Sequence, residues 1–120
     1  MTAETNDDAW IDPAAQRRLT AAAVGSADIA QRFFDDFVRS WPGRLQRLAS
    51  GLEASDADVA HVALLSIRSS SEMVGALPLA RLARRLEDAA QLGHLDECLA
   101  GLSELRRVGD LTVRAMAARG

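Results

Sequence analysis

The sequence predicts an all-α fold: an up-down-up-down antiparallel four-helix bundle with an extra short N-terminal helix. The 120 residues are rich in alanine, leucine and arginine, while aromatic residues make up only 4% and tyrosine is absent, a composition that favours helix over sheet. Apolar residues recur at steps of three and four in five successive segments, which is the periodicity of amphipathic helices. The breaks between these segments are short, so neighbouring helices are expected to be antiparallel.

The chain is long enough for one domain with one core. Residues 1–9 are polar and acidic without periodicity, and we expect a flexible tail there, followed by a single domain over residues 10–120. The N-terminus lacks a basic and hydrophobic signal segment, and no apolar run approaches the length of a membrane span. A cytoplasmic protein that does not enter the membrane is therefore expected.

The first helix is predicted to begin at Asp12 and Pro13, because aspartate is a favoured N-cap and proline is favoured at the first helical position. It is expected to end near Ala23. Trp10 and Ile11 are apolar residues just before it, and they are predicted to hold it against the bundle.

The second helix is predicted to follow the break at Gly25, with Ser26 as its cap. Its apolar stripe consists of Ile29, Phe33 or Phe34, Phe37, Val38, Trp41, Leu45, Leu48 and Leu52. Pro42 removes a helical hydrogen bond, so this long helix is expected to be kinked or broken near Trp41.

The third helix is predicted from Asp56, capped by Ser55, to between Met73 and Gly75. Small and branched residues repeat along one face of it and predict burial: Ala60, Ala63, Leu64, Ile67, Ser70 or Ser71, and Val74. The opposite face carries His61, Leu65, Arg68, Ser69 and Glu72. Leu65 is the one apolar residue at the centre of this polar face.

The fourth helix is expected to start at Pro78 and end at Gly93, and the fifth to run from about Leu95 to Ala117. Their predicted inward residues are Leu79, Leu82, Ala83, Leu86 and Ala90, and then Leu95, Cys98 or Leu99, Leu102, Leu105, Val108 or Gly109, and Thr112. Gly109 is expected to weaken the last helix by about 1 kcal/mol relative to alanine.

The third predicted helix carries a motif. Residues 64–76, LLSIRSSSEMVGA, resemble the signature helix of histidine-phosphotransfer (HPt) domains, whose pattern is roughly AHxLKGSSxxLGA. Six of the matches are Ile67 for the leucine, Arg68 for the lysine, Ser70 and Ser71 for the serine pair, and Gly75 and Ala76 for the close of the motif. The resemblance implies a four-helix module that relays phosphoryl groups between sensor kinases and response regulators, and it covers the chain from about Ile11 onward.

Two departures fall at the chemical centre of that motif. Leu65 stands where the family has its phosphorylatable histidine, and Ser69 stands where it has a glycine that lets the partner approach closely. The family's Gly-Asp turn lies ten residues before the phospho-site, and counting from Ser55 also ends on Leu65. His61 shares the face but lies one turn upstream, about 6 Å along the helix axis.

The resemblance therefore implies a docking module that does not relay phosphate, because a leucine side chain has no lone pair to accept a phosphoryl group. The expected partner is a response-regulator receiver domain or a histidine kinase. The expected binding residues are His61, Leu65, Arg68, Ser69 and Glu72, with Leu65 suited to the dry centre of a small interface with a polar rim. Ser69 adds two heavy atoms relative to glycine and hinders close approach.

Two alternatives stay open. His61 is a fallback phospho-acceptor, with Arg68 or Arg84 near the phosphoryl group. A purely structural bundle that dimerises would keep the architecture without relay partners. The set of Arg68, Arg81, Arg84 and Arg85 could bind an anion, or form a solvated face balanced by Glu72, Glu87 and Asp88.

Other function classes receive no support. Two histidines and one cysteine do not provide the usual thiolate zinc site or a disulfide framework, so neither metal nor cofactor is expected, and Cys98 is predicted to be a small core residue. The net charge of −3 and the sparse arginine pairs argue against nucleic-acid binding. The high alanine and arginine content is compatible with a GC-rich bacterial genome.

Overall fold

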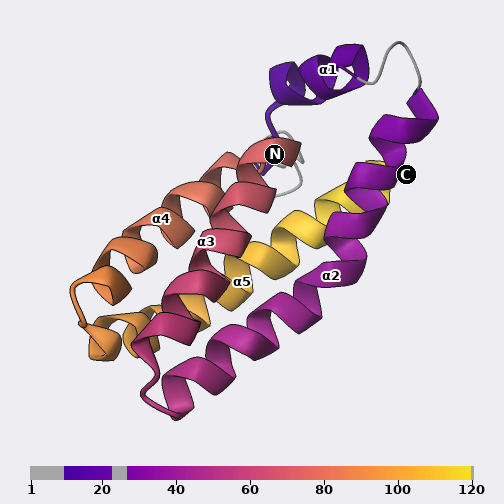
Figure 1. The fold of residues 1–120 in the computed structure, drawn as a ribbon. Coiled ribbons are helices and arrows are strands. Elements are labelled where there is room, and N and C mark those ends of the chain that lie inside the picture. The colour runs from indigo at the N-terminus through magenta and orange to yellow at the C-terminus, as the bar shows by residue number, and fades with distance from the viewer. Residues whose placement is uncertain (1–9, 23–26, 120) are drawn as a thin grey trace, which may run out of the picture.

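The computed structural model describes residues 10–22 and 27–119, and it confirms the all-α prediction (Figure 1). The chain forms five helices: α1 (Pro13–Ala22), α2 (Ala27–Glu53), α3 (Ala57–Val74), α4 (Leu77–Gln91) and α5 (Leu95–Arg119). Helix α2 packs against α3 and α5, and α4 packs against the same two helices, so α2 to α5 form the up-down-up-down bundle. The predicted tail over residues 1–9 and the predicted cap at Ser26 lie outside the described residues.

The core lies between the four long helices and follows the predicted stripes. Its most deeply buried large side chains come from all four helices and from the segment before α1: Ile11, Leu48, Leu64, Ile67, Leu79 and Leu105. Burial of each of these side chains stabilises the fold by roughly 1.5–3 kcal/mol. Where the periodicity left two choices, the buried residues are Phe34, Ser71 and Cys98, while Val108 and Gly109 are both buried. Ile29, predicted on the buried stripe, is instead 43% exposed near the start of α2.

Helix α2 was predicted to be kinked or broken near Trp41; it is continuous through Pro42, so the break is wrong. Proline in a helix removes one backbone hydrogen bond, but the flanking side chains Trp41 and Leu45 are both buried in the core. Pro42 itself lies on the exposed side of α2. Packing of the stripe on either side of the proline therefore outweighs the local loss.

The turn before α3 also differs from the prediction. Asp56, and not Ser55, caps the helix: its carboxylate accepts a hydrogen bond from the Val59 backbone N–H at 3.1 Å. Ser55 adopts a left-handed backbone with φ of 53° and forms the turn itself. The cap of α1 is as predicted, since Asp12 accepts a hydrogen bond from the Ala14 N–H at 3.0 Å.

The α3–α4 turn fixes α1 across one end of the bundle. Gly75 ends α3 in the left-handed conformation, with φ of 77°. Its carbonyl accepts a hydrogen bond from the Asp12 N–H at 2.7 Å, and a Cβ atom at Gly75 would lie 2.4 Å from the Cβ of Ala15. This position thus combines a backbone conformation that favours glycine with a close approach of α1.

Gly109 has a packing role that corrects the prediction of a weak point in α5. A Cβ atom there would lie 1.9 Å from a ring carbon of Trp41, so the indole lies directly against the α5 backbone. The ring N–H of Trp41 donates a hydrogen bond to Asp110 at 2.9 Å. Because Gly109 has no side chain, the indole ring of Trp41 can pack directly on the backbone of α5.

Gly75→Ala tests the docking of α1. Gly93 has the same left-handed backbone, with φ of 80°, but nothing within 4 Å of a built Cβ, so Gly93→Ala reports backbone strain alone. We expect Gly93→Ala to lower the free energy of unfolding by about 1 kcal/mol. Gly75→Ala should lower it by roughly 2–4 kcal/mol, because overpacking against Ala15 adds to the strain. Urea denaturation measures both; equal losses would show that α1 does not press on the turn.

Cys98 should make stability fall at alkaline pH. Burial, with a smaller contribution from the charges of Glu97 and Asp96, raises the pKa of the thiol, which donates a hydrogen bond to the Leu86 carbonyl at 3.3 Å. The folded state therefore holds the thiol proton more tightly than the unfolded state. Its stabilising effect is complete below the unfolded-state pKa of about 8.5 and is lost as pH rises through the folded-state pKa.

The measurement is the free energy of unfolding between neutral and alkaline pH for the natural chain and for Cys98→Ala. A decline at alkaline pH that is steeper in the natural chain is expected. Identical pH dependence in both chains would contradict a raised thiol pKa.

Candidate functional site

The five residues predicted to form a binding surface all lie on α3. His61 is partly exposed, Leu65 is 37% exposed, and Ser69 and Glu72 are exposed. Arg68 differs, since only 18% of its side-chain surface is accessible. His61, Leu65, Arg68 and Glu72 follow one another at helical steps of three and four, so they form one continuous strip along α3.

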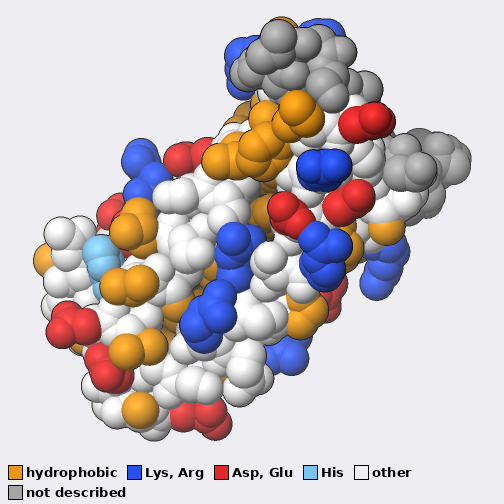
Figure 2. All heavy atoms as spheres, turned by 45° about the vertical axis from the view of Figure 1, so that its right-hand side comes forward, with side chains coloured by type: hydrophobic (Ala, Val, Ile, Leu, Met, Phe, Trp, Pro, Cys, Tyr) orange, Lys and Arg blue, Asp and Glu red, His pale blue; other side chains and the backbone are white. Residues whose placement is uncertain are grey.

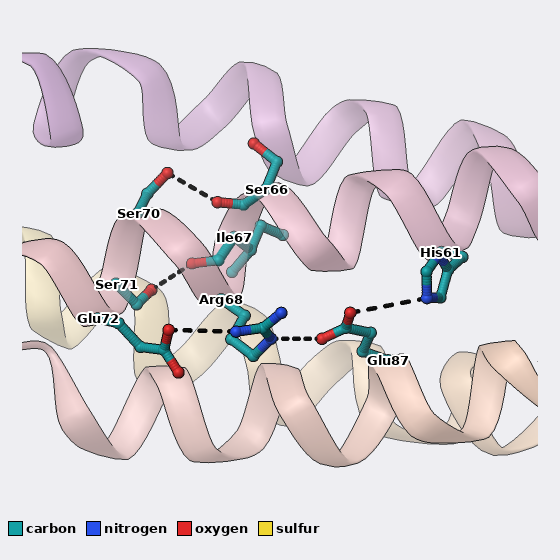
Figure 3. A network of polar contacts seen from close by, with 8 residues as sticks. All are labelled: His61, Ser66, Ile67, Arg68, Ser70, Ser71, Glu72 and Glu87. Atoms are coloured by element: carbon teal, nitrogen blue, oxygen red, sulfur yellow. Dashed lines mark hydrogen bonds and ion pairs between the residues drawn. The ribbon is translucent and has the colours of Figure 1, made fainter.

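A buried carboxylate from α4 organises this strip (Figure 3). Arg68 Nε donates a hydrogen bond to Glu87 Oε1 at 2.5 Å, and Arg68 Nη1 donates one to Glu72 Oε1 at 3.1 Å. The other oxygen of Glu87 lies 3.6 Å from His61 Nε2, which is longer than a hydrogen bond. The Glu87 carboxylate of α4 thus faces two side chains of α3. His61 lies four residues before Leu65 and Arg68 lies three residues after it.

Glu87 was missed as a site residue by the sequence analysis, which placed it on a solvated face. It is 8% exposed, whereas Arg81, Arg84, Arg85 and Asp88 of α4 are exposed as predicted. A signal for its burial was available, because Glu87 continues the buried series Leu79 and Ala83 at a step of four. The periodicity of α4 alone does not predict which side chain of α3 contacts Glu87.

The electrostatics of the strip are dominated by these carboxylates. The hydrogen bond to Glu87 is the main cause that raises the pKa of the Arg68 guanidinium above its ordinary value, and the charges of Glu87 and Glu72 add to it. Arg68 is therefore a cation whose charge is matched by two carboxylates. Arg68, Glu72 and Glu87 together carry one positive and two negative charges.

The serine cluster that follows Arg68 is largely structural. Ser70 Oγ donates to the Ser66 carbonyl at 2.7 Å, and buried Ser71 Oγ donates to the Ile67 carbonyl at 2.6 Å, so both hydroxyls bond back to their own helix (Figure 3). Ser69 is the exposed member. It lines a shallow groove between α2 and α3, together with Phe33 and Met73.

The rest of this face is a mixture of apolar and charged side chains. Val59 and Val62 of α3 are 43% and 62% exposed, and Phe33, across the groove on α2, is 38% exposed. Figure 2 shows that hydrophobic side chains on the face it presents form small groups among polar and charged ones. Phe33 is thus the phenylalanine that borders this surface, while Phe34 and Phe37 belong to the core.

The arrangement leaves an apolar side chain partly exposed in the middle of a polar strip of α3. Leu65 offers no nucleophile at the position that the motif assigns to the phospho-acceptor. His61 Nε2 lies 3.6 Å from the Glu87 carboxylate, so this ring nitrogen faces a negative charge. Among residues 10–22 and 27–119, no three or more His, Cys, Asp or Glu side chains are grouped so that they could hold a metal ion. None of the described helices is long and apolar enough to span a membrane.

Comparison with known proteins places this geometry in a family. The family model described as "Hpt domain" matches residues 32–117. Among solved structures, histidine-containing phosphotransfer protein B (HptB) from Pseudomonas aeruginosa PAO1 is similar, with a TM-score of 0.84 at 24% sequence identity over 92% of this chain and 93% of that chain. A comparison with curated protein sequences found no match. Since the family model covers most of the bundle, including the whole of α3 and α4, the chain belongs to the Hpt domain family.

Proposed function

We propose that this domain binds a response-regulator receiver domain or a histidine kinase through the α3 strip and does not relay phosphate. The family makes it a signalling module of the phosphorelay type. The observation that carries the proposal is Leu65, an exposed apolar side chain at the position that aligns with the phospho-histidine. Because the proposed partners are bacterial signalling proteins, we expect the interaction to occur in the bacterial cytoplasm.

The surface around Leu65 has the composition of a small interface. Apolar area continues from Leu65 to Val62 along α3, while His61, Arg68 and Glu72 provide a polar border. Interfaces of this kind derive most of their affinity from a few apolar contacts that become dry, and their polar border sets orientation. A partner that covers this strip would bury Leu65 at its centre.

Ser69 modifies the proposed docking geometry. Its exposed side chain occupies the place of the family's glycine, at the edge of the groove that Phe33 and Met73 line. A partner must therefore stand slightly farther from α3 here, or use the serine hydroxyl as a hydrogen-bond group. The apolar row of Leu65 and Val62 then contributes more of the contact.

Phosphotransfer through His61 fits the geometry less well than docking. Its side chain is 32% exposed, but Nε2 lies 3.6 Å from Glu87, whose carboxylate would repel a phosphoryl group. A bundle that only dimerises would use the same exposed apolar residues with a second copy as partner. Binding measurements with receiver and kinase domains separate that reading from the proposal.

Leu65→Glu should weaken docking. A carboxylate at the centre of the contact must lose its water without gaining a partner, so we expect affinity to fall at least roughly tenfold. Leu92→Glu is the matched control, because Leu92 is 71% exposed in the α4–α5 turn and is not part of the strip, so the change should leave affinity unchanged. Isothermal titration calorimetry against purified receiver and kinase domains of the source organism measures both.

Equal affinities of the natural chain and Leu65→Glu would exclude the α3 strip as the docking surface. Binding to none of these domains, with a dimer in analytical ultracentrifugation that Leu65→Glu dissociates, would favour the structural bundle.

The chain should also remain unlabelled when it is incubated with a phosphorylated receiver or kinase domain that binds it. Leu65 cannot accept the phosphoryl group, and the carboxylate beside His61 disfavours that imidazole. Acid-labile phosphate is measured on the natural chain and on His61→Ala. Label on the natural chain that disappears in the variant would make His61 a relay residue and refute the docking-only function.

A further inference from the structure

We propose that Arg44 and Arg47 of α2 form a binding site for a carboxylate side chain of the docked partner. The inference rests on the proposed function and deepens it, because it names a chemical group that the partner must present beside the α3 strip. We call these two residues the arginine pair. They give the docking surface a preference for acidic partners.

The arginine pair lies next to the turn of α3 that carries Leu65. Arg44 Nε donates a hydrogen bond to Ser66 Oγ at 3.3 Å, and Ser66 directly follows Leu65 in the sequence. Arg47 lies three residues after Arg44, so the two side chains are neighbours on the surface of α2. A partner that covers Leu65 and extends over the edge of α3 toward α2 therefore reaches both guanidinium groups.

The arginine pair has no counter-charge within the described part of the chain. No ion pair formed among residues 10–22 and 27–119 includes Arg44 or Arg47. Arg68 on α3 and Arg107 on α5, by contrast, each pair with a carboxylate. A carboxylate accepts hydrogen bonds at both of its oxygens, so a single carboxylate of a partner can bind both guanidinium groups of the arginine pair.

Partial burial increases the need for a counter-charge at Arg44. Arg44 is partly buried, whereas Arg47 is exposed. Burial and, to a smaller degree, the positive charge of Arg47 lower the pKa of the Arg44 guanidinium below its ordinary value. Both effects oppose the charged form of Arg44, and a carboxylate placed beside it would favour that form instead.

Two hollows of the α2–α3 surface lie on either side of the arginine pair. One, of about 270 Å³, is the shallow groove that Phe33 borders, and Arg44 lines it. The other, of about 390 Å³, is lined by Arg47, Val59 and Val62. Figure 2, in which α2 comes forward, shows basic side chains between hydrophobic groups on this face. The matching partner surface therefore presents an acidic side chain between two apolar ones, which exclude water from around the ion pair.

Two carboxylates of the chain also line these hollows, but at their outer ends. Asp36 pairs with Arg39 of its own helix. Asp58 is exposed near the start of α3, about 12 Å along the helix axis from Ser66. Since neither forms an ion pair with the arginine pair, the place between the two hollows is left for a carboxylate of the partner.

The first experiment uses no receiver or kinase domain. The probes are a short N-acetylated oligoglutamate peptide and an oligoglutamine peptide of the same length, and the readout is the Nε–Hε NMR signal of each arginine. We expect oligoglutamate to shift the Arg44 and Arg47 signals saturably and at least roughly threefold more than the signal of Arg107, which is already paired with Glu104. Oligoglutamine should shift none of them.

The second experiment measures affinity by isothermal titration calorimetry, with a receiver or kinase domain that binds the natural chain. Arg44→Gln/Arg47→Gln should lower the affinity at least roughly tenfold and make it less sensitive to salt. Arg106→Gln/Arg107→Gln removes the same charge from exposed positions of α5 and should change the affinity less than about twofold. Circular dichroism confirms folding. If the α2 double variant does not fold, Arg47→Gln replaces it and should lower the affinity at least roughly threefold.

Equal shifts of the Arg44, Arg47 and Arg107 signals would overturn the inference. Equal affinities of the natural chain and Arg44→Gln/Arg47→Gln would overturn it too, and the docking function would stand because binding persists. If no receiver or kinase domain binds the natural chain, the docking function fails, and the NMR titration by itself decides whether the arginine pair binds carboxylates.

Discussion

The packing of α3 against its neighbours is the constraint on which the rest of the structure depends. The buried face of α3 is built from small and branched side chains, with Ala60, Leu64 and Ser71 completely inaccessible. Small side chains let α3 lie close to α2 and α4, and the hydroxyl of Ser71 can be buried because it bonds to the Ile67 carbonyl of its own helix. The turn that ends α3 also holds α1 through Gly75, so α3 packs against α1, α2 and α4.

The close approach of α3 and α4 also determines the chemistry of the surface. A carboxylate as buried as that of Glu87 needs a partner, and Arg68 provides one at 2.5 Å. A buried ion pair of this kind contributes little net stability compared with apolar residues of the same size, but it sets which groups remain available at the surface. Arg68, the basic residue of the family motif, consequently donates hydrogen bonds to Glu87 and Glu72 of the same bundle.

The family explains the architecture, and individual residues explain the proposed departure from relay. The Hpt domain match establishes the family and its signalling class, and the similarity to HptB supports the fold. Leu65 supplies no nucleophile at the position that the motif assigns to the phospho-acceptor. An exposed leucine within a polar strip is the feature on which the proposed docking function rests.

The sequence by itself determined the helices, their buried faces, the cap at Asp12 and the identity of the residue at the phospho-acceptor position, because helical periodicity, capping and motif spacing are local properties. Only the tertiary structure decided that α2 continues through Pro42, that Gly109 accommodates Trp41, and that Glu87 meets Arg68 and His61. These three features depend on the axial register and distance between helices. That register is set by contacts between side chains that are far apart in the sequence. It therefore cannot be predicted from any single segment of the chain.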